Sequence, residues 1–245
     1  LYDNFESYPL THIPGITAAF RQALRKADGI TCVSRPLAEY VLKTTHCSCP
    51  IEVIENAVPE KLFHPMDQSI SRRKLKLPEN DILIGTAGAI SRSRGIDSLV
   101  GAFEVIAKKR TDIHLVLAGP CDKDIILSSH PRLHYLGVLP QDTVPIFLSS
   151  LNINVICNRD SEFGRYCFPQ KYFEAVACGV PVVAAATGAI LELLKNTPAL
   201  LFEPDNIDSL VSVLLSQIAN PIASSAEIQT WTMLGKRLDK FFLSL

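Results

Sequence analysis

The chain has no excess of positive charge and no long hydrophobic run. Its 245 residues carry 24 Lys and Arg against 25 Asp and Glu, for a net charge of −1. Nucleic-acid-binding domains normally present a clustered basic surface, so this balance argues against that class. No apolar run approaches the roughly 20 residues that a membrane-spanning helix needs. The start also lacks the layout of a secretory signal, so a cytoplasmic location is expected.

The signatures of a metal site and of a dinucleotide-binding enzyme are also missing. The seven cysteines are scattered, mostly within apolar segments, where reduced and buried thiols are expected. Cys47 and Cys49 form the one close pair, but no second cysteine or histidine pair stands at zinc spacing, so no metal is expected. No Gly-x-Gly-x-x-Gly follows an expected strand, which argues against a dehydrogenase.

Two short basic runs, at residues 72–74 and 108–110, are the main concentrations of positive charge. We interpret both as solvated faces of helices, with peripheral attachment to an acidic membrane surface as the alternative. The chain is 47% hydrophobic, which is ample for a folded core of this length.

The clearest structural pattern lies at residues 167–192. Pro169 suits the first turn of a helix, whose body at residues 170–178 ends at Gly179, a favoured left-handed C-terminal stop. The apolar run at residues 182–186 is typical of a strand that is covered on both faces. A further helix can start after this run. The stretch therefore predicts a helix, strand, helix unit of a parallel sheet.

Two charged residues interrupt this apolar unit. Lys171 and Glu174 are three residues apart, so they are neighbours on one helical face near the helix N-terminus. Such an N-terminus beside a parallel sheet favours anions, because free backbone N–H groups and the helix dipole attract negative charge. A ligand with phosphates and hydroxyls would fit there. The alternative is an exposed ion pair between the two side chains.

The full pattern is Pro-x-Lys-x-x-Glu-Ala-x-Ala-x-Gly-x-Pro-Val-Val, with Gly188 and Glu192 following. It resembles the donor-site signature of family 4 glycosyltransferases, enzymes of the GT-B fold. The resemblance implies an α/β protein whose Rossmann-like parallel sheet has helices on both faces. It also implies that Lys171 stabilises the diphosphate of a sugar nucleotide and that Glu174 holds the ribose. Backbone N–H groups near Gly188 and Ala189 would approach phosphate or sugar.

A second candidate stretch follows the strand expected at residues 82–87. Gly88 permits close backbone approach to a ligand, and Arg94 offers a fork of donors that matches phosphate oxygens. A strand that leads through a glycine loop to a helix is how α/β folds cradle phosphates. The stretch resembles the family's Gly-x-x-x-x-x-Lys-Gly-x-Asp loop, with Arg94 in place of lysine. Ala89 stands where many members have arginine, and Arg92 is a candidate substitute. In the alternative interpretation, Arg94 only caps or solvates the helix start.

The loop at residues 158–168 departs most from the family pattern. Many family members have two glutamates with seven residues between them. The second corresponds to Glu174, and the position of the first falls on Tyr166 in this loop. Glu162 is the nearest carboxylate and the candidate to reach the donor sugar, with an ordinary surface loop as the alternative. The resemblance further implies that Gly137 and Val138, in a turn after another expected strand, border the nucleotide base.

Residues 1–57 alternate helix and strand signals but contain only two strands, which are too few to stand alone. They resemble the end of the acceptor domain and the hinge of GT-B enzymes. Residues 58–224 would then form the donor-binding domain, and residues 225–245 a C-terminal helix that crosses back. Most of the acceptor domain would be absent, so activity of this chain alone is in doubt. The polar, aromatic patch at residues 2–8 with His12 is either catalytic or an ordinary loop.

The resemblance implies transfer of a hexose from a UDP- or GDP-linked donor, with retention of anomeric configuration and without metal or another cofactor. Arg94, Lys171 and Glu162 are the expected catalytic residues, the first two by stabilising the departing diphosphate. The acceptor is a glycan, a lipid or a small molecule, and the enzyme would work in the cytoplasm or at the inner face of the membrane. The alternatives are a non-catalytic module that binds nucleotide sugars and a sugar-nucleotide epimerase of the same fold.

Overall fold

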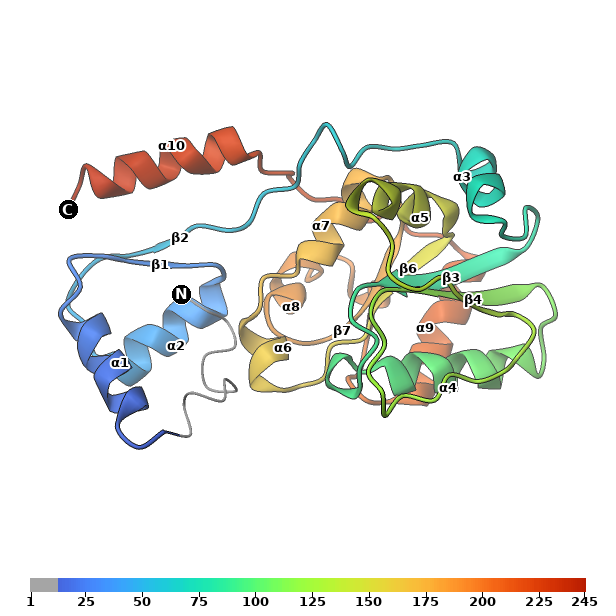
Figure 1. Cartoon of the computed structure of the whole chain (residues 1–245), viewed down its shortest axis with the longest axis horizontal. Coiled ribbons are helices and arrows are strands. Elements are labelled where there is room, and N and C mark those ends of the chain that lie inside the picture. Colours follow the sequence, from blue (N-terminus) through green and yellow to red (C-terminus); the bar gives the residue numbers. More distant parts are fainter. Residues whose placement is uncertain (1–12) are drawn as a thin grey trace.

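The computed structural model describes residues 13–245, so the patch at residues 2–8 with His12 lies outside the described residues. The described chain has a six-stranded sheet between layers of helices and a smaller unit with two strands (Figure 1). The final helix, α10 (Trp231–Phe242), extends from the larger unit back to the smaller one (Figure 1). Within these residues, no helix has the length and apolar character that crossing a bilayer requires.

All six strands of the larger sheet run parallel, in the order β5-β4-β3-β6-β7-β8. The direction in which the chain adds strands reverses between β3 and β6. In sheets of this kind, ligands bind beyond the carboxyl ends of the strands at such a reversal. The strands are β3 (Ile82–Ala87), β4 (Ile113–Ala118), β5 (Leu133–Tyr135), β6 (Ile153–Ile156), β7 (Val182–Ala185) and β8 (Leu201–Phe202).

Helices cover both faces of this sheet, which confirms the predicted fold class (Figure 1). One face packs on α4 (Ile96–Ala107) and α9 (Ile207–Ala219), and the other on α3 (Gln68–Leu75), α5 (Val144–Ser150) and α7 (Gln170–Ala177). Phe103 of α4 and Tyr172 of α7 are fully buried in these two layers. Because every side chain of β4 is buried, its sequence reads as a continuous apolar run interrupted only by His114.

The smaller unit consists of α1 (Ile16–Arg25), β1 (Ile30–Cys32), α2 (Arg35–Thr45) and β2 (Ile51–Val53). Its two strands are parallel neighbours. The side chain of Ser34 caps α2 by accepting a hydrogen bond from a backbone N–H of its first turn. Arg237 of α10 forms ion pairs with Glu52 and Glu55 at 3.2 and 3.0 Å. The end of the chain is therefore attached to the smaller unit.

The final helix begins at Trp231, whereas the sequence predicts a start near residue 225. The residues before it leave helical geometry to bond to the larger unit. The backbone N–H of Val182 donates to Ser224 Oγ at 2.9 Å, and the Tyr172 hydroxyl donates to the Ser225 carbonyl at 3.0 Å. Hydrogen bonds to residues distant in the sequence therefore keep residues 225–230 out of the helix, although their sequence has a helical period.

Arg72 is buried, so its prediction as part of a solvated helix face is wrong. Only 3% of the residue is exposed. Its guanidinium donates to the carbonyls of Ser150, Glu79 and Asp81 and to the side-chain oxygen of Asn152, over 2.6 to 3.0 Å. These acceptors come from other parts of the chain, so the pattern within α3 could not reveal them. Arg72 fastens α3 to the amino end of the sheet.

Candidate anion-binding site

Two loops border the point where the strand order reverses, at the carboxyl edge of the sheet. Gly88 follows β3 and leads through a 3-10 turn, Arg92–Arg94, into α4. Residues 158–168 follow β6 and contain the short helix α6 (Glu162–Tyr166). Both loops contain residues that the sequence predicts to bind the ligand. Their position agrees with the general location of ligand sites in parallel α/β sheets.

Lys171 extends from the first turn of α7 to the glycine loop. A methyl group built on Gly88 would lie 2.5 Å from Nζ of Lys171 and 2.6 Å from its Cε. Gly88 also has a φ of 123°, which side-chain-bearing residues rarely adopt. Glycine is therefore needed here both for the turn and for the space that the lysine occupies.

The surroundings of Lys171 disfavour the protonated, positively charged form of its amine. Burial and, next, the positive charge of Arg94 lower the pKa of Lys171 to about 8, against weaker opposing effects of Cys157 and Glu174. Burial raises the pKa of Glu174, although Gln170 and Lys171 act in the other direction. Both side chains of the predicted pair are partly buried, so an exposed ion pair does not describe them. Two neighbouring cations at a glycine loop favour a bound anion.

Arg94 lies over an aromatic ring that the sequence did not single out. Its Cζ atom is 3.7 Å from the centroid of the Phe163 ring. Arg94 is partly buried and belongs to the turn after β3, whereas Phe163 belongs to α6 after β6. A contact between two loops so far apart in the sequence leaves no periodic or spacing signal. Arg94 is thus more than a solvated charge at the start of α4.

The predicted base-contacting residues Gly137 and Val138 lie beside the same glycine loop. The backbone N–H of Gly119 donates to the Gly137 carbonyl at 2.7 Å, and a methyl group on Gly119 would overlap the carbonyl of Gly88. A methyl group on Gly137 would meet nothing within 4 Å, and Val138 is 70% exposed. Gly137 and Val138 therefore lie at the surface of this corner. Gly119, which follows β4, is a member of the site that sequence reasoning did not assign.

Gly188 and Ala189 lie at the start of α8 (Ala189–Leu193) and line a cleft of about 690 Å³. A methyl group built on Gly188 would overlap the carbonyl oxygen of Gly164 and would lie 2.7 Å from that of Arg165, so there is no room for a side chain. The cleft separates the smaller unit from α7 and α8. Its other lining residues include Ser34, Arg35 and Glu39 on one side and Phe168, Phe173 and Glu192 on the other.

The loop at residues 158–168 does not place a carboxylate at the position of the expected first glutamate. Tyr166 occupies that position and stacks on Tyr40 of α2, with ring centroids 4.7 Å apart. The Ser34 hydroxyl donates to the Tyr166 carbonyl at 2.6 Å. Tyr166 thus holds the loop against the smaller unit. Glu162 is exposed in the first turn of α6, and its catalytic role stays a prediction.

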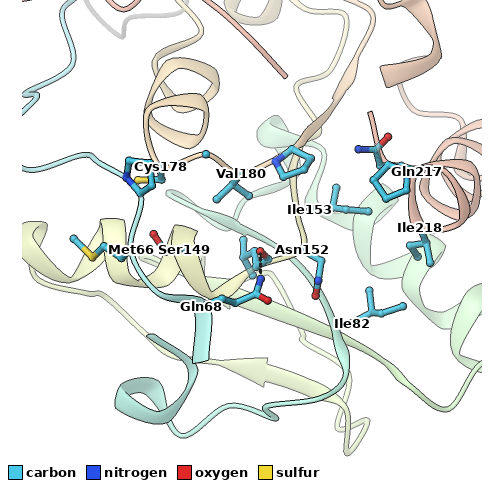
Figure 2. Close-up of a pocket in the computed structure, with 15 residues that line it drawn as sticks. Met66, Gln68, Ile82, Ser149, Asn152, Ile153, Cys178, Val180, Gln217 and Ile218 are labelled. Carbon is cyan, nitrogen blue, oxygen red and sulfur yellow. Dashed lines mark hydrogen bonds between the residues drawn. The ribbon is translucent and has the colours of Figure 1, made fainter. Parts of the chain in front are cut away.

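A second hollow, of about 520 Å³, lies at the opposite end of the strands (Figure 2). Ile82 and Ile153, the first residues of β3 and β6, line it together with Cys178, Ser149 and Gln217. No residue predicted for ligand binding lines this hollow. Because parallel sheets bind ligands at their carboxyl ends, we assign the candidate site to the Gly88, Arg94 and Lys171 corner.

Residues 81–220, more than half of the chain, match the family model described as "Glycosyl transferases group 1". The chain is 26% identical to a GDP-mannose-dependent monoacylated alpha-(1-6)-phosphatidylinositol monomannoside mannosyltransferase from Corynebacterium glutamicum, over 91% of this chain and 65% of the relative. It is 28% identical to the phosphatidylinositol N-acetylglucosaminyltransferase GPI3 subunit from Saccharomyces cerevisiae, over 83% of this chain and 45% of the relative. The chain therefore spans between about half and two thirds of these relatives.

A solved structure shares the fold. HepE from Anabaena, in complex with UDP and glucose, superposes with a TM-score of 0.80 at 20% sequence identity. The match covers 99% of this chain and 70% of that chain. The smaller unit, the six-stranded sheet and the returning α10 thus occur together in another protein.

Proposed function

Because the chain belongs to the group 1 glycosyltransferase family, we propose that it carries the donor site of an enzyme that transfers a hexose from a nucleotide sugar to an acceptor. We further propose that the transfer retains the anomeric configuration and needs no metal. The cations of the site would supply the charge stabilisation that a metal gives elsewhere.

The observation that carries this proposal is the meeting of Lys171 and Arg94 at the Gly88 loop. Both cations lie at the strand-order reversal, and the lysine pKa of about 8 leaves most of its charge in place at pH 7. A nucleoside diphosphate brings negative charge to this point, and more of it when the sugar leaves. Glu174, on the same helix as Lys171, would accept hydrogen bonds from ribose hydroxyls.

The relatives' names support a UDP- or GDP-linked donor and a lipid acceptor for this chain. One relative is named for GDP-mannose, one solved structure holds UDP and glucose, and two relatives are named for phosphatidylinositol substrates. A lipid acceptor would bring the enzyme to a membrane surface as a peripheral protein. Seven free cysteines favour a reducing compartment, which supports a cytoplasmic location. The 690 Å³ cleft would admit the acceptor beside Gly188 and Ala189.

Calorimetric titration of UDP, GDP and ADP, and of their common sugar conjugates, tests the proposal without added metal. The wild-type chain should prefer one nucleotide, and Glu174→Ala should weaken that binding. Glu104→Ala, at an exposed position of α4, should leave it unchanged. A correctly folded chain that binds none of these ligands at millimolar concentration would contradict the donor-site proposal.

A second candidate is a non-catalytic module that binds nucleotide sugars. The packing of Tyr166 against Tyr40, where the family pattern has a glutamate, favours it. Sugar transfer by the full-length protein separates the two candidates. Turnover that Glu174→Ala abolishes would exclude the module, whereas nucleotide binding without any transfer to a lipid, glycan or small-molecule acceptor would support it.

A further inference from the structure

The stacked pair of Arg94 and Phe163 joins the two loops that border the candidate site. Arginine has a long and flexible side chain, so an unsupported guanidinium loses conformational freedom when it binds an anion. A ring at 3.7 Å from Cζ covers one face of the guanidinium. Stacking uses the face of the guanidinium and not the N–H donors in its plane, so it is compatible with hydrogen bonds from these donors to phosphate oxygens.

Phe163 is itself held in place by its short helix. Ser161 Oγ caps α6 by accepting from the Gly164 backbone N–H at 3.2 Å. Gly164 packs directly against the carbonyl of Arg159, where a side chain would overlap it. The backbone on both sides of the ring is thus fixed by contacts at residues 159–164.

Arg159 fastens this loop to the loop that carries Arg94. Its guanidinium donates to the Arg92 carbonyl at 2.6 Å and forms ion pairs with Asp97 at 2.5 Å and with Asp205 at 2.8 Å. Arg92 and Asp97 flank Arg94 in the chain. The ring and the guanidinium therefore belong to one connected assembly, and their relative position does not depend on the stack alone.

We propose that Phe163 is a positioning residue that orients the guanidinium of Arg94 toward a diphosphate bound beside Lys171. This inference rests on the proposed function, because it needs a diphosphate ligand. It explains why the chain has arginine where the family loop it resembles has lysine. A planar guanidinium can stack on a ring and still present a fork of donors, whereas an ammonium is a point charge that a ring cannot orient.

A double-mutant cycle with the 245-residue chain tests the proposal by calorimetry. Phe163→Leu should weaken binding of UDP or GDP about tenfold and should change binding of the nucleoside alone little. In the Arg94→Lys background the same substitution should have less than a threefold effect. Phe163→Trp, which keeps an aromatic face, should restore binding to within about threefold of wild type. Urea unfolding checks that each variant is folded.

Equal binding by wild type and Phe163→Leu would overturn the positioning role while leaving the proposed function intact. The positioning role would also be wrong if Phe163→Leu lost as much affinity in the Arg94→Lys background as in the wild-type background, or if Phe163→Trp failed to restore binding. A wild-type chain that binds neither nucleotide would remove the proposed function and this inference together.

A measurement without substitution of Phe163 covers the case in which the leucine variant does not fold. The Arg94 Nε–H resonance, identified through its loss in Arg94→Lys, should be displaced upfield by the ring current of Phe163. A chemical shift like that of a solvated arginine would overturn the proposal.

Discussion

Buried cations stand at both ends of the six-stranded sheet, and the two ends accommodate them in opposite ways. At the amino end, the guanidinium of Arg72 donates to four protein oxygens. At the carboxyl end, the amine of Lys171 lies against Gly88, and the nearby charge of Arg94 opposes its protonation. The first arrangement is complete within the fold, whereas we propose that a bound anion completes the second. Burial alone therefore does not distinguish a structural cation from a ligand-binding one.

Histidines at the amino end follow the same rule as Arg72. His114 Nδ1 lies 2.8 Å from His134 Nε2, and His114 Nε2 lies 3.0 Å from Asp81. Burial lowers the pKa of both histidines, so they are mainly neutral at pH 7. At the amino end, the buried titratable groups are therefore either mainly neutral or hydrogen-bonded to protein oxygens. The carboxyl end keeps the positive charges of Lys171 and Arg94 close together, which is a stability disadvantage that the proposed anion site would explain.

The largest expected change in stability comes from the amino end. Arg72→Leu should lower the free energy of unfolding by about 3 kcal/mol, because one buried and three partly buried oxygens lose their donor. Arg73→Leu is the matched control, since Arg73 is exposed and pairs with Glu79 on the surface. It should change stability by less than about 0.5 kcal/mol. Urea unfolding of the two variants makes the comparison, and equal effects would contradict the structural role of Arg72.

Lys171→Met should change stability in the opposite direction and remove nucleotide binding. At pH 7 the variant should be more stable by about 1–3 kcal/mol, because it no longer holds a buried charge beside Arg94. Its affinity for UDP or GDP should fall at least about 100-fold, as expected when a buried charged contact to phosphate is lost. Lys195→Met, at an exposed lysine, should alter neither property. Loss of stability in Lys171→Met would show that the amine supports the fold.

The pH dependence of that stability gain follows from the direction of the pKa shift. The folded chain has the lower lysine pKa, about 8 against 10.5, so between these values the unfolded chain binds more protons. The free-energy cost of burying the Lys171 charge is therefore fully present below pH 8 and decreases as the pH rises toward 10.5. Urea unfolding should therefore show the advantage of Lys171→Met shrinking from pH 7 to pH 10. A constant advantage across this range would contradict a charge-based penalty.

The smallest expected effect concerns the ribose contact of Glu174. Wild type should bind UDP or GDP about tenfold better than the corresponding 2′,3′-dideoxynucleotide, in line with hydrogen bonds to a charged acceptor. Glu174→Gln should reduce this preference to about threefold or less. Competition calorimetry measures both ratios. An unchanged preference in the variant would place the ribose elsewhere.

The positions of residues at the carboxyl end of the sheet are easier to predict from the sequence than the contacts at the amino end, for a physical reason. Gly88, Lys171 and Glu174 lie in short stretches whose spacing sets their positions on a turn and a helix face. The contacts of Arg72, and of Phe163 with Arg94, join residues that are distant in the chain, and no local spacing encodes them. The α6 helix is equally hidden, because five residues around Gly164 carry no helical period.

Direct titration of the Lys171 amine tests whether an anion completes the carboxyl end of the sheet. The Cε resonance of Lys171, identified through its loss in Lys171→Met, reports its protonation by NMR with and without UDP or GDP. We expect a pKa of about 8 in the free chain, rising when the nucleotide binds. An ordinary lysine pKa near 10.5 that neither nucleotide changes would contradict a ligand-binding role for this cation.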